Sequence, residues 1–338
     1  MKGVNLKILA EKLNVSVSTV SRALSDSYEI SEETKKKVME LAKELNYRPN
    51  PYATSLRKQK SRTIAVIIPE IANNFFSIAI NGIEEIAQEK GYHVLIYLTH
   101  ENHLKETSII KQLIGRVDGI LMSMATETND ISHITELKEH NIPIVFFDRV
   151  CEKINTVKVT TDDFDSGFKA TQHLIDQGCK KIAYLSVSLN LSIDQKRMQG
   201  YQKALEVNNL PADDNPLVSC SANDEENFLT IKNLLTSDNR PDAIFASVER
   251  LAITAYLVCR ELKLSIPADI KVLGFSNLQT APLLDPALTT ITQPAFQMGK
   301  EAAIALFGAL KRNIAELEDE KIILSSTLIE RQSTKDID

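Results

Sequence analysis

The chain has 338 residues, of which 43% are hydrophobic and 25% are charged. This length is too great for one ordinary hydrophobic core, and two or three domains are expected. No apolar run approaches the ~20 residues that a membrane-spanning helix needs, and charges interrupt the apolar N-terminus, so we expect a cytoplasmic protein.

The net charge of −6 conceals an asymmetry along the chain. Residues 1–62 contain 13 Lys and Arg against 7 Asp and Glu, a net charge of +6, whereas the remaining residues contain 26 against 38, a net charge of −12. A basic head on an acidic body predicts a polyanionic partner for the head alone.

The first predicted helix and the turn after it have the pattern of a helix-turn-helix. The apolar residues of this helix fall on one face, at Leu6, Leu9, Ala10 and Leu13. Asn14 follows where the turn needs a left-handed backbone, which Asn tolerates better than any residue except Gly. Ser16 is predicted to cap the second helix.

The second predicted helix has two contrasting faces. Its apolar face is expected to contain Val17, Val20 and Leu24, and its opposite face has short polar groups and one cation, at Ser18, Thr19, Ser21 and Arg22. Such a face is typical of a helix in the DNA major groove, where short polar groups reach base edges and Arg binds guanine through two hydrogen bonds. The alternative is a small three-helix bundle with a solvated Ser and Thr face.

A third helix is predicted between a cap at Ser31 and an end at Asn46 and Pro49. Its inner stripe is expected at Val38, Leu41, Ala42 and Leu45. The three helices make a head of about 46 residues, whose core alone is marginal.

The segment NPYATSLRK, residues 50–58, places a leucine among cations. Asn50 can cap a helix that starts at Pro51, but the run is shorter than the roughly 12–15 residues that an isolated helix needs, so it would fold only on binding. A short cationic helix with Leu56 exposed suits insertion into a DNA minor groove, where the side chain unstacks a base step. The alternative is a disordered linker whose leucine contacts the next domain.

From Thr63 onward, apolar strands alternate with amphipathic helices. One series contains TIAVIIP, HVLIYLT, DGILMSM and IPIVFFD, and a second contains KIAYLSV, LVSC, DAIFAS and IKVLGFS. This alternation predicts an α/β fold with two doubly wound parallel-sheet subdomains and a cleft between them. Ligands of such sheets bind beyond the carboxyl ends of the strands, where the candidate side chains include Glu70, Met124, Arg149, Ser188 and Asn277.

The chain resembles the LacI/GalR family of bacterial repressors in segments that run in order along nearly its whole length. Besides the head and residues 50–58, these are NNFF (73–76), VDGI (117–120), IPIVFFDR (142–149), ATQHLIDQGCKKIAYLS (170–186), RMQGY (197–201), KVLGFSN (271–277), ALTTITQP (287–294) and LIERQS (328–333). The resemblance implies a helix-turn-helix head, a hinge helix that orders on operator DNA with Leu56 as the minor-groove wedge, and a core with the periplasmic sugar-binding fold.

The resemblance also implies domain limits and site residues. Residues 1–48 would form the DNA-binding domain, 49–61 the hinge, and 62–338 the core, with subdomain one at about 62–161 plus 291–322 and subdomain two at about 162–290 plus 323–338. The predicted DNA-binding residues are Asn5, Leu6, Ser16, Val17, Ser18, Thr19, Arg22, Asn50, Tyr52, Ala53, Ser55, Leu56, Arg57 and Lys58. The predicted effector-binding residues are Asn73, Phe75, Phe76, Asp148, Arg197, Glu249, Ser276 and Gln293.

The chain departs from the family pattern at three sites: Asn74 stands in place of a proline, Val248-Glu249 in place of Asn-Asp, and Ser276-Asn277 in place of Asp-Asp. A serine cannot replace a charged acceptor that binds two sugar hydroxyls. Either Glu249 substitutes for it, or the effector is a phosphorylated metabolite, a purine-like compound or a partner protein that docks outside the cleft.

An enzyme or a ligand-binding carrier on the same fold is the remote alternative. The sequence has no G-x-G-x-x-G, P-loop or G-x-S-x-G motif. The cysteines at 151, 179, 220 and 259 are predicted to be buried thiols, His100 and His103 are predicted to be a solvated pair on a loop, and no metal or cofactor is expected.

These features predict a homodimeric, sequence-specific DNA-binding transcription regulator, a repressor of metabolic genes. Its two heads would occupy the half-sites of a pseudo-palindromic operator. A small-molecule effector in the cleft would change the distance between the two hinge segments and hence the affinity for DNA.

Overall fold

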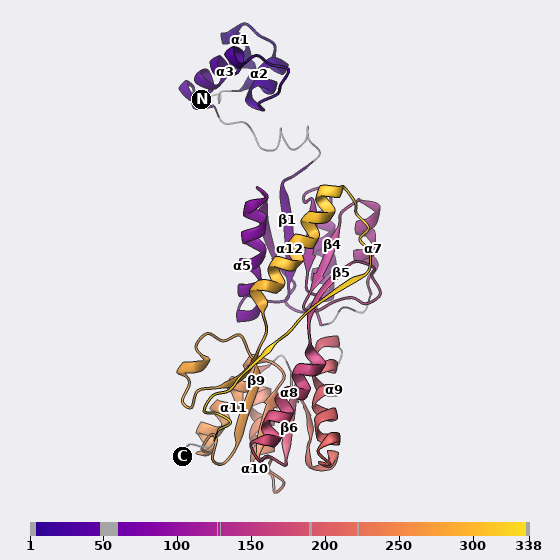
Figure 1. Cartoon of the computed structure of the whole chain (residues 1–338), viewed down its shortest axis with the longest axis vertical. Coiled ribbons are helices and arrows are strands. Elements are labelled where there is room, and N and C mark those ends of the chain that lie inside the picture. Colours follow the sequence, from indigo (N-terminus) through magenta and orange to yellow (C-terminus); the bar gives the residue numbers. More distant parts are fainter. Residues whose placement is uncertain are drawn as a thin grey trace. The chain divides into compact units, whose positions relative to one another are not determined.

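The computed structural model describes residues 5–47, 60–126, 128, 130–188, 191–221 and 223–335. The chain divides into two compact units, Met1–Ser61 and Arg62–Asp338 (Figure 1). Most of the predicted hinge, residues 49–59, lies outside the described residues, and with it the predicted contacts of Asn50, Tyr52, Ala53, Ser55, Leu56, Arg57 and Lys58.

Three helices form the described part of the first unit, with bounds α1 Leu6–Leu13, α2 Val17–Leu24 and α3 Glu32–Glu44. Asn14 ends α1 in the left-handed conformation at φ 51°, and the Ser16 side chain accepts a hydrogen bond from the backbone N of Thr19, which confirms the predicted turn and cap. The buried core of this unit is small and contains Leu9, Ala10, Val20, Ala23, Val38 and Ala42.

The predicted apolar face of α2 was wrong at one position. Val17 is 44% exposed, whereas Ala23 is buried together with Val20. Val17 is the first residue of the helix, and the packing against the neighbouring helices is centred one turn later. Val17 is therefore available to a partner of the head.

The second unit contains two six-stranded sheets in the described part of the chain, each mainly parallel. The first sheet has the order β11-β5-β4-β3-β1-β2, with bounds β1 Thr63–Ile68, β2 His93–Leu98, β3 Gly119–Met122, β4 Ile144–Phe147, β5 Val157–Thr161 and β11 Glu320–Leu324. The second has the order β12-β10-β9-β8-β6-β7, with bounds β6 Ile182–Ser186, β7 Leu217–Ser219, β8 Ala243–Ala246, β9 Lys271–Phe275, β10 Thr289–Thr292 and β12 Thr327–Ile329.

Helices cover both faces of each sheet, so the central strands are apolar on both sides. In β1, Ile64 and Val66 pack under one pair of helices while Ala65 and Ile67 pack under the other. The helices of subdomain one are α5 Asn74–Glu89 with α12 Ala295–Arg312 on one face, and α6 His103–Leu113 with α7 Ser132–Glu139 on the other. Those of subdomain two are α8 Asp163–Asp176 with α9 Ser192–Val207, and α10 Asp224–Thr236 with α11 Glu249–Leu262, besides the short η1 Ala212–Asp214 and η2 Ala281–Leu283.

The chain passes between the two sheets three times (Figure 1). The first crossing follows β5 at Thr161, the second follows β10 at Thr292, and the third lies between β11 and β12. The last two crossings lie two residues later than the expected limits of 291 and 322, because Ile291 pairs within the second sheet and Leu324 pairs within the first.

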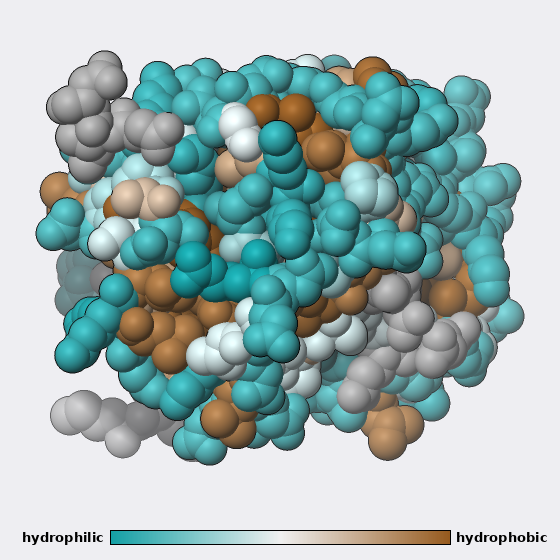
Figure 2. Space-filling model, turned by 90° about the horizontal axis from the view of Figure 1, so that it is seen from below, coloured by the Kyte–Doolittle hydropathy of each residue, from teal (hydrophilic) through white to brown (hydrophobic). Residues whose placement is uncertain are grey.

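The surface shown in Figure 2 has apolar side chains in separate patches surrounded by hydrophilic ones. Among the described residues, no helix combines the length and the apolar character that crossing a bilayer requires.

Candidate functional site: the head and the cleft

The polar side of α2 is organised around its cap. The Ser16 hydroxyl lies 2.7 Å from the Ser18 hydroxyl and 2.8 Å from that of Thr19, and it accepts the backbone N–H of Thr19 at 3.0 Å. Ser18 is exposed and Thr19 is half-buried. The hydroxyl groups that were predicted to contact DNA therefore form a connected cluster at the start of the helix. At the start of α1, Asn5 accepts the backbone N–H groups of Lys7 and Ile8, and Leu6 is half-buried.

Arg22, the predicted base-reading cation, lies at the exposed side of the same helix. Its Nε lies 3.1 Å from Glu29 Oε2, and both side chains are 47% exposed. An exposed ion pair of this kind contributes little to stability, typically 0.2–1 kcal/mol, and can be exchanged for a contact with a ligand. Tyr28, which is not among the predicted DNA-binding residues, is 93% exposed next to Glu29 in the sequence.

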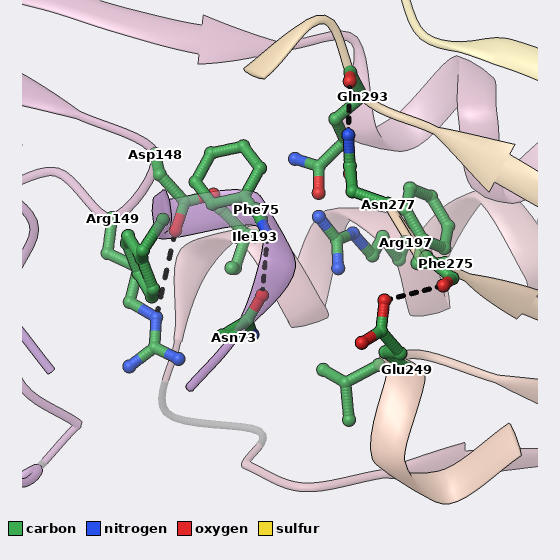
Figure 3. A pocket seen from close by; sticks show the side chains of 13 residues that line it. Asn73, Phe75, Asp148, Arg149, Ile193, Arg197, Glu249, Phe275, Asn277 and Gln293 are labelled. Carbon is green, nitrogen blue, oxygen red and sulfur yellow. Dashed lines mark hydrogen bonds and ion pairs between the residues drawn. The ribbon is translucent and has the colours of Figure 1, made fainter. Parts of the chain in front are cut away.

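All eight predicted effector-binding residues line one pocket between the two sheets of the second unit (Figure 3). The pocket contains about 420 Å³ of space, part of it open to solvent. Its other lining residues are Arg149, Ile193, Val248, Phe275 and Asn277. Of the other strand-end candidates, Met124 is buried in the core of subdomain one and Glu70 is exposed.

Arg197 is buried at the floor of this pocket with only 3% of its surface exposed. Its Nε donates to Asp163 Oδ1 at 2.9 Å and its Nη1 donates to the carbonyl of Ser247 at 2.8 Å. The guanidinium lies over the Phe275 ring, 3.8 Å from the ring centre, a cation–π contact. Burial opposes the charge of Arg197, but Asp163 and Asp148 outweigh it and raise the pKa of Arg197 above its ordinary value.

Two glycines let the helix of Arg197 approach the neighbouring helix closely. A Cβ at Gly167 of α8 would lie 2.2 Å from the carbonyl oxygen of Arg197, and a Cβ at Gly200 of α9 would lie 2.1 Å from that of Phe164. Any larger residue would push α8 and α9 apart. The close packing places Asp163 at the start of α8 within hydrogen-bonding distance of Arg197 on α9.

Asp148 lies at the opposite side of the pocket, directly after β4, in the left-handed conformation at φ 61°. The residue is 5% exposed, and its Oδ2 lies 3.9 Å from Nε of Arg149. Burial raises the pKa of Asp148 to about 6, although Arg149 and Arg197 favour its ionised form. The group can therefore change charge close to neutral pH.

Arg149 is held at the rim by Glu101, a residue outside the predicted site. Arg149 Nη1 donates to both oxygens of Glu101, at 2.7 and 2.8 Å. Glu101 Oε2 also accepts the backbone N–H and the hydroxyl of Thr126, each at 2.9 Å. Burial works against the charge of Glu101, but Arg149 and Thr126 together hold its pKa below the ordinary value.

The three departures from the family pattern meet in one hydrogen-bond network. Asn74 Nδ2, at the start of α5 in subdomain one, donates to Glu249 Oε1 at 2.7 Å. Glu249 begins α11 of subdomain two, and its Oε2 accepts from the Ser276 hydroxyl at 2.6 Å. We call Asn74, Glu249 and Ser276 the clasp. It connects the two subdomains directly across the pocket.

Several polar atoms of the pocket are buried and have no hydrogen-bond partner among the described residues: Arg149 Nε, Arg197 Nη2 and Asn277 Oδ1. Unpaired buried groups are costly, and a pocket with both donors and acceptors in this state is suited to a polar ligand.

The crossings behind the pocket are also hydrogen-bonded to one another. Gln293 Nε2 donates to the Thr161 hydroxyl at 3.2 Å, and Asn277 Nδ2 donates to the carbonyl of Gln293 at 2.7 Å. Asp162 Oδ1 accepts the backbone N–H of Ser326 at 2.8 Å. A rotation of one subdomain against the other would therefore act on these contacts and on the clasp.

A helix-turn-helix head together with a core of two parallel-sheet subdomains around a polar pocket defines a ligand-responsive DNA-binding regulator as the class of protein. Residues 5–50 match the model of the bacterial regulatory proteins of the lacI family, and residues 61–329 match that of the periplasmic binding proteins and sugar binding domain of the LacI family. The chain belongs to the LacI family of bacterial regulatory proteins, and it is a transcriptional regulator rather than an enzyme.

Individual relatives span nearly the whole chain. It is 32% identical to catabolite control protein A of Priestia megaterium over 336 residues, 98% of this chain and 99% of the relative. Among solved structures, it is similar to a LacI family transcriptional regulator from Enterococcus faecium with bound ribose, with a TM-score of 0.73 and 27% identity over 82% of this chain and 100% of that one. The Lac repressor dimer bound to operator and the anti-inducer ONPF has the same fold, with a TM-score of 0.85 at 23% identity over 99% of this chain and 100% of the other.

Proposed function

We propose that the protein is a cytoplasmic homodimeric repressor whose operator affinity is set by a neutral, polyhydroxylated ligand of one sugar ring in the pocket between the subdomains. The single observation that carries the choice of ligand is the balance of charge around the pocket. Two guanidinium groups, Arg149 and Arg197, face four carboxylates, those of Asp148 and Glu249 and of the ion-pair partners Glu101 and Asp163.

This balance disfavours a phosphorylated ligand. Both arginines are already paired with carboxylates, at 2.7 Å for Glu101 and 2.9 Å for Asp163, so neither offers an uncompensated positive charge to a dianion. With all six groups ionised the net charge is −2, which repels phosphate in a site of low dielectric constant. A neutral ligand avoids this repulsion.

The hydrogen-bonding groups favour hydroxyls. A sugar hydroxyl both donates and accepts, so it can satisfy the carboxylates of Asp148 and Glu249 and also the unpaired nitrogens of Arg149 and Arg197. The relative with bound ribose, similar over the whole length of its solved chain, supports a monosaccharide.

DNA recognition is assigned to the head and the hinge. We propose that Val17, Ser18, Thr19 and Arg22 contact the major groove, that Ser16, Asn5 and Leu6 position the helix on the backbone, and that Leu56 inserts into the minor groove. The Lac repressor dimer on its operator supports a twofold arrangement. Exposed apolar side chains on both subdomains, at Leu95, Ile96, Leu257 and Leu283, are consistent with a dimer contact.

The test measures DNA and ligand together. An operator is first selected from random duplexes by the full-length protein, and its affinity is then measured with matched pairs of monosaccharides and their phosphate esters. We expect a change in operator affinity with one neutral sugar and little change with its phosphate. A response to phosphate esters alone would overturn the ligand assignment, and a lack of any selected sequence would overturn the DNA-binding assignment.

The partner protein that the sequence left open as an alternative effector would dock outside the pocket and change operator affinity without a sugar. The same operator assay with cell extract in place of sugars distinguishes it.

A further inference from the structure

A cluster of two histidines and a glutamate lies in subdomain one, outside the pocket lining. His103 is the first residue of α6, Glu106 lies one turn further along, and His133 lies in the first turn of α7. One ligand atom from each of the three side chains lies within 4.8 Å of those of the other two. The prediction of a solvated loop for His103 is therefore wrong, although His100 is exposed.

The cluster is buried and its carboxylate is held in a fixed orientation. Glu106 is fully buried and His133 is 2% exposed. Glu106 Oε1 accepts from His133 Nε2 and from the Thr128 hydroxyl, each at 2.9 Å, and Oε2 accepts from the backbone N of Ala125 at 2.9 Å.

Both imidazole rings keep a buried nitrogen without a partner. Within the described residues, Nδ1 of His103 and Nδ1 of His133 have no hydrogen-bond partner. The two rings are in edge-to-face contact, with centroids 5.1 Å apart. A buried polar atom in this state is destabilising unless a function accounts for it.

We propose that His103, Glu106 and His133 form a binding site for a divalent transition-metal ion of the zinc type, with a fourth position open to water. Two imidazoles and one carboxylate are a donor set that such ions prefer, and three protein ligands with an open position are an established coordination for Zn²⁺. When the metal binds His133 Nε2, the ring proton moves from Nε2 to Nδ1, and the metal takes the place of that proton between His133 and Glu106.

The geometry requires only small movements, in which His133 Nε2 and Glu106 Oε1 separate slightly and His103 approaches them. Bonds of about 2.0–2.2 Å place the ligand atoms of a tetrahedral Zn²⁺ roughly 3.3 Å apart. His133 Nε2 and Glu106 Oε1 are already at 2.9 Å. The half-buried His103 lies at the start of its helix, where it can supply the remaining movement. The donors from Ala125 and Thr128 would orient the carboxylate from outside the coordination sphere, as in known metal sites.

The site is connected to the rim of the pocket through a short chain of contacts. Glu106 binds the backbone of Ala125, and the next residue, Thr126, donates twice to Glu101. Glu101 holds Arg149, which lines the pocket. Metal binding would therefore fix the segment after β3 and the position of Arg149. This inference goes beyond the proposed function and does not depend on which ligand the pocket binds.

The experiment uses the full-length protein, freed of metal by a chelator and titrated with Zn²⁺ in equilibrium dialysis, with Co²⁺ absorption as an independent reading of tetrahedral coordination. The variant is His103→Ala, because His103 is the least buried of the three. The matched control is His140→Ala, an exposed histidine at the end of α7.

We expect one Zn²⁺ per chain, with affinity reduced by at least about tenfold in His103→Ala and unchanged in His140→Ala. Equal binding by both variants, or no saturable binding by the unmodified protein, would overturn the proposal. If His103→Ala does not fold, as judged by circular dichroism, His103→Gln takes its place. Tetrahedral Co²⁺ bands in the unmodified protein support the site, and octahedral bands alone overturn it.

Discussion

The side-chain amide of Asn74 donates a hydrogen bond of 2.7 Å to Glu249, which lies 175 residues further along the chain and in the other subdomain. The second oxygen of Glu249 is held by Ser276 at 2.6 Å. Because the two partners stand at the first turns of α5 and α11, this bond exists only when these helix ends meet. It therefore favours the closed arrangement of the pocket before any ligand binds.

Asn74→Asp should open the pocket. The substitution replaces a donor with a carboxylate facing Glu249, and a hydrogen bond to a charged group is worth about 1.5–3 kcal/mol. The equilibrium between closed and open states should shift by about tenfold or more, which is measured as a larger radius of gyration in small-angle scattering and as weaker ligand binding. Asn209→Asp, an exposed change of the same charge outside the pocket lining, is the control. Identical scattering of both variants would show that the clasp does not influence closure.

Asp148→Asn should reduce the dependence of stability on pH. The carboxyl of Asp148 has an ordinary pKa of 3.8, and burial raises it to about 6 in the folded protein. Between these values the folded state binds more protons than the unfolded state, so this group makes stability fall as pH rises from about 4 to about 6 and has a constant effect above. Denaturation of the variant above pH 6 should show a gain of up to about 3 kcal/mol. An unchanged pH profile would contradict the assignment.

The same carboxyl should make ligand binding depend on pH. A hydroxyl donates to the ionised form of Asp148, so affinity for a neutral sugar should fall as pH decreases below about 6 and level off above it. Titration calorimetry at several pH values measures how the affinity for the sugar changes with pH. Asp148→Asn should abolish this pH dependence and most of the affinity for the sugar. Affinity that rises on acidification would mean that the ligand accepts a proton from Asp148 instead.

Arg197→Ala should affect folding as well as ligand binding. Removing the guanidinium leaves Asp163 buried without its partner, and breaking a buried ion pair in this way costs about 3–5 kcal/mol. Arg197→Lys keeps the charge but loses the planar contact with Phe275 and the donor to Ser247. We expect the Arg197→Lys protein to fold, as measured by thermal unfolding. In an operator assay it should bind DNA but no longer respond to the ligand. Full ligand response in the Lys variant would remove Arg197 from the binding site.

Glu29→Gln should strengthen operator binding. Arg22 is paired with Glu29 at 3.1 Å, and this exposed pair, worth about 0.2–1 kcal/mol, must be exchanged when Arg22 contacts a base. The gain should be a few-fold and larger than that of Glu44→Gln, an exposed change of equal charge on α3. Equal gains in both variants would reflect net charge alone. Arg22→Ala should in addition relax the base preference in a random-site selection.

Leu56→Ala should weaken specific binding far more than nonspecific binding. A minor-groove wedge acts only on a kinked site, whereas cations such as Lys58 act on any duplex. Fluorescence anisotropy with an operator and an unrelated duplex, at several salt concentrations, measures both. Lys58→Ala is the contrasting variant, in which the salt dependence should flatten. Equal losses on both duplexes would exclude the wedge.

The ends of the head helices could be predicted because they depend on neighbouring residues. Asn14 and Ser16 adopt the left-handed and capping conformations that their side chains favour, and these preferences act over three or four positions. The error at Val17 arose where burial depends on packing against other helices. Periodicity identifies the apolar face of a helix. It does not show over what length of the helix the neighbouring helices cover that face.

The resemblance to the LacI/GalR family, together with the rule that ligands bind at the carboxyl ends of parallel strands, predicted eight residues that line one pocket. Their positions relative to one another were not predictable. Periodicity predicts which residues end a strand. It does not predict that Glu101 pairs with Arg149 or that Asp163 pairs with Arg197, because these contacts depend on how loops and helices pack.

By itself, then, the sequence determined the order of the elements, the basic head and the residues at the strand ends. Each of these features depends only on composition and on the pattern of neighbouring residues. The tertiary structure alone decided that Asn74 meets Glu249 across the pocket and that His103 meets His133 outside the pocket lining. Both pairs join separate helices, and such contacts depend on where the chain crossings and the sheet order bring the helices together in space.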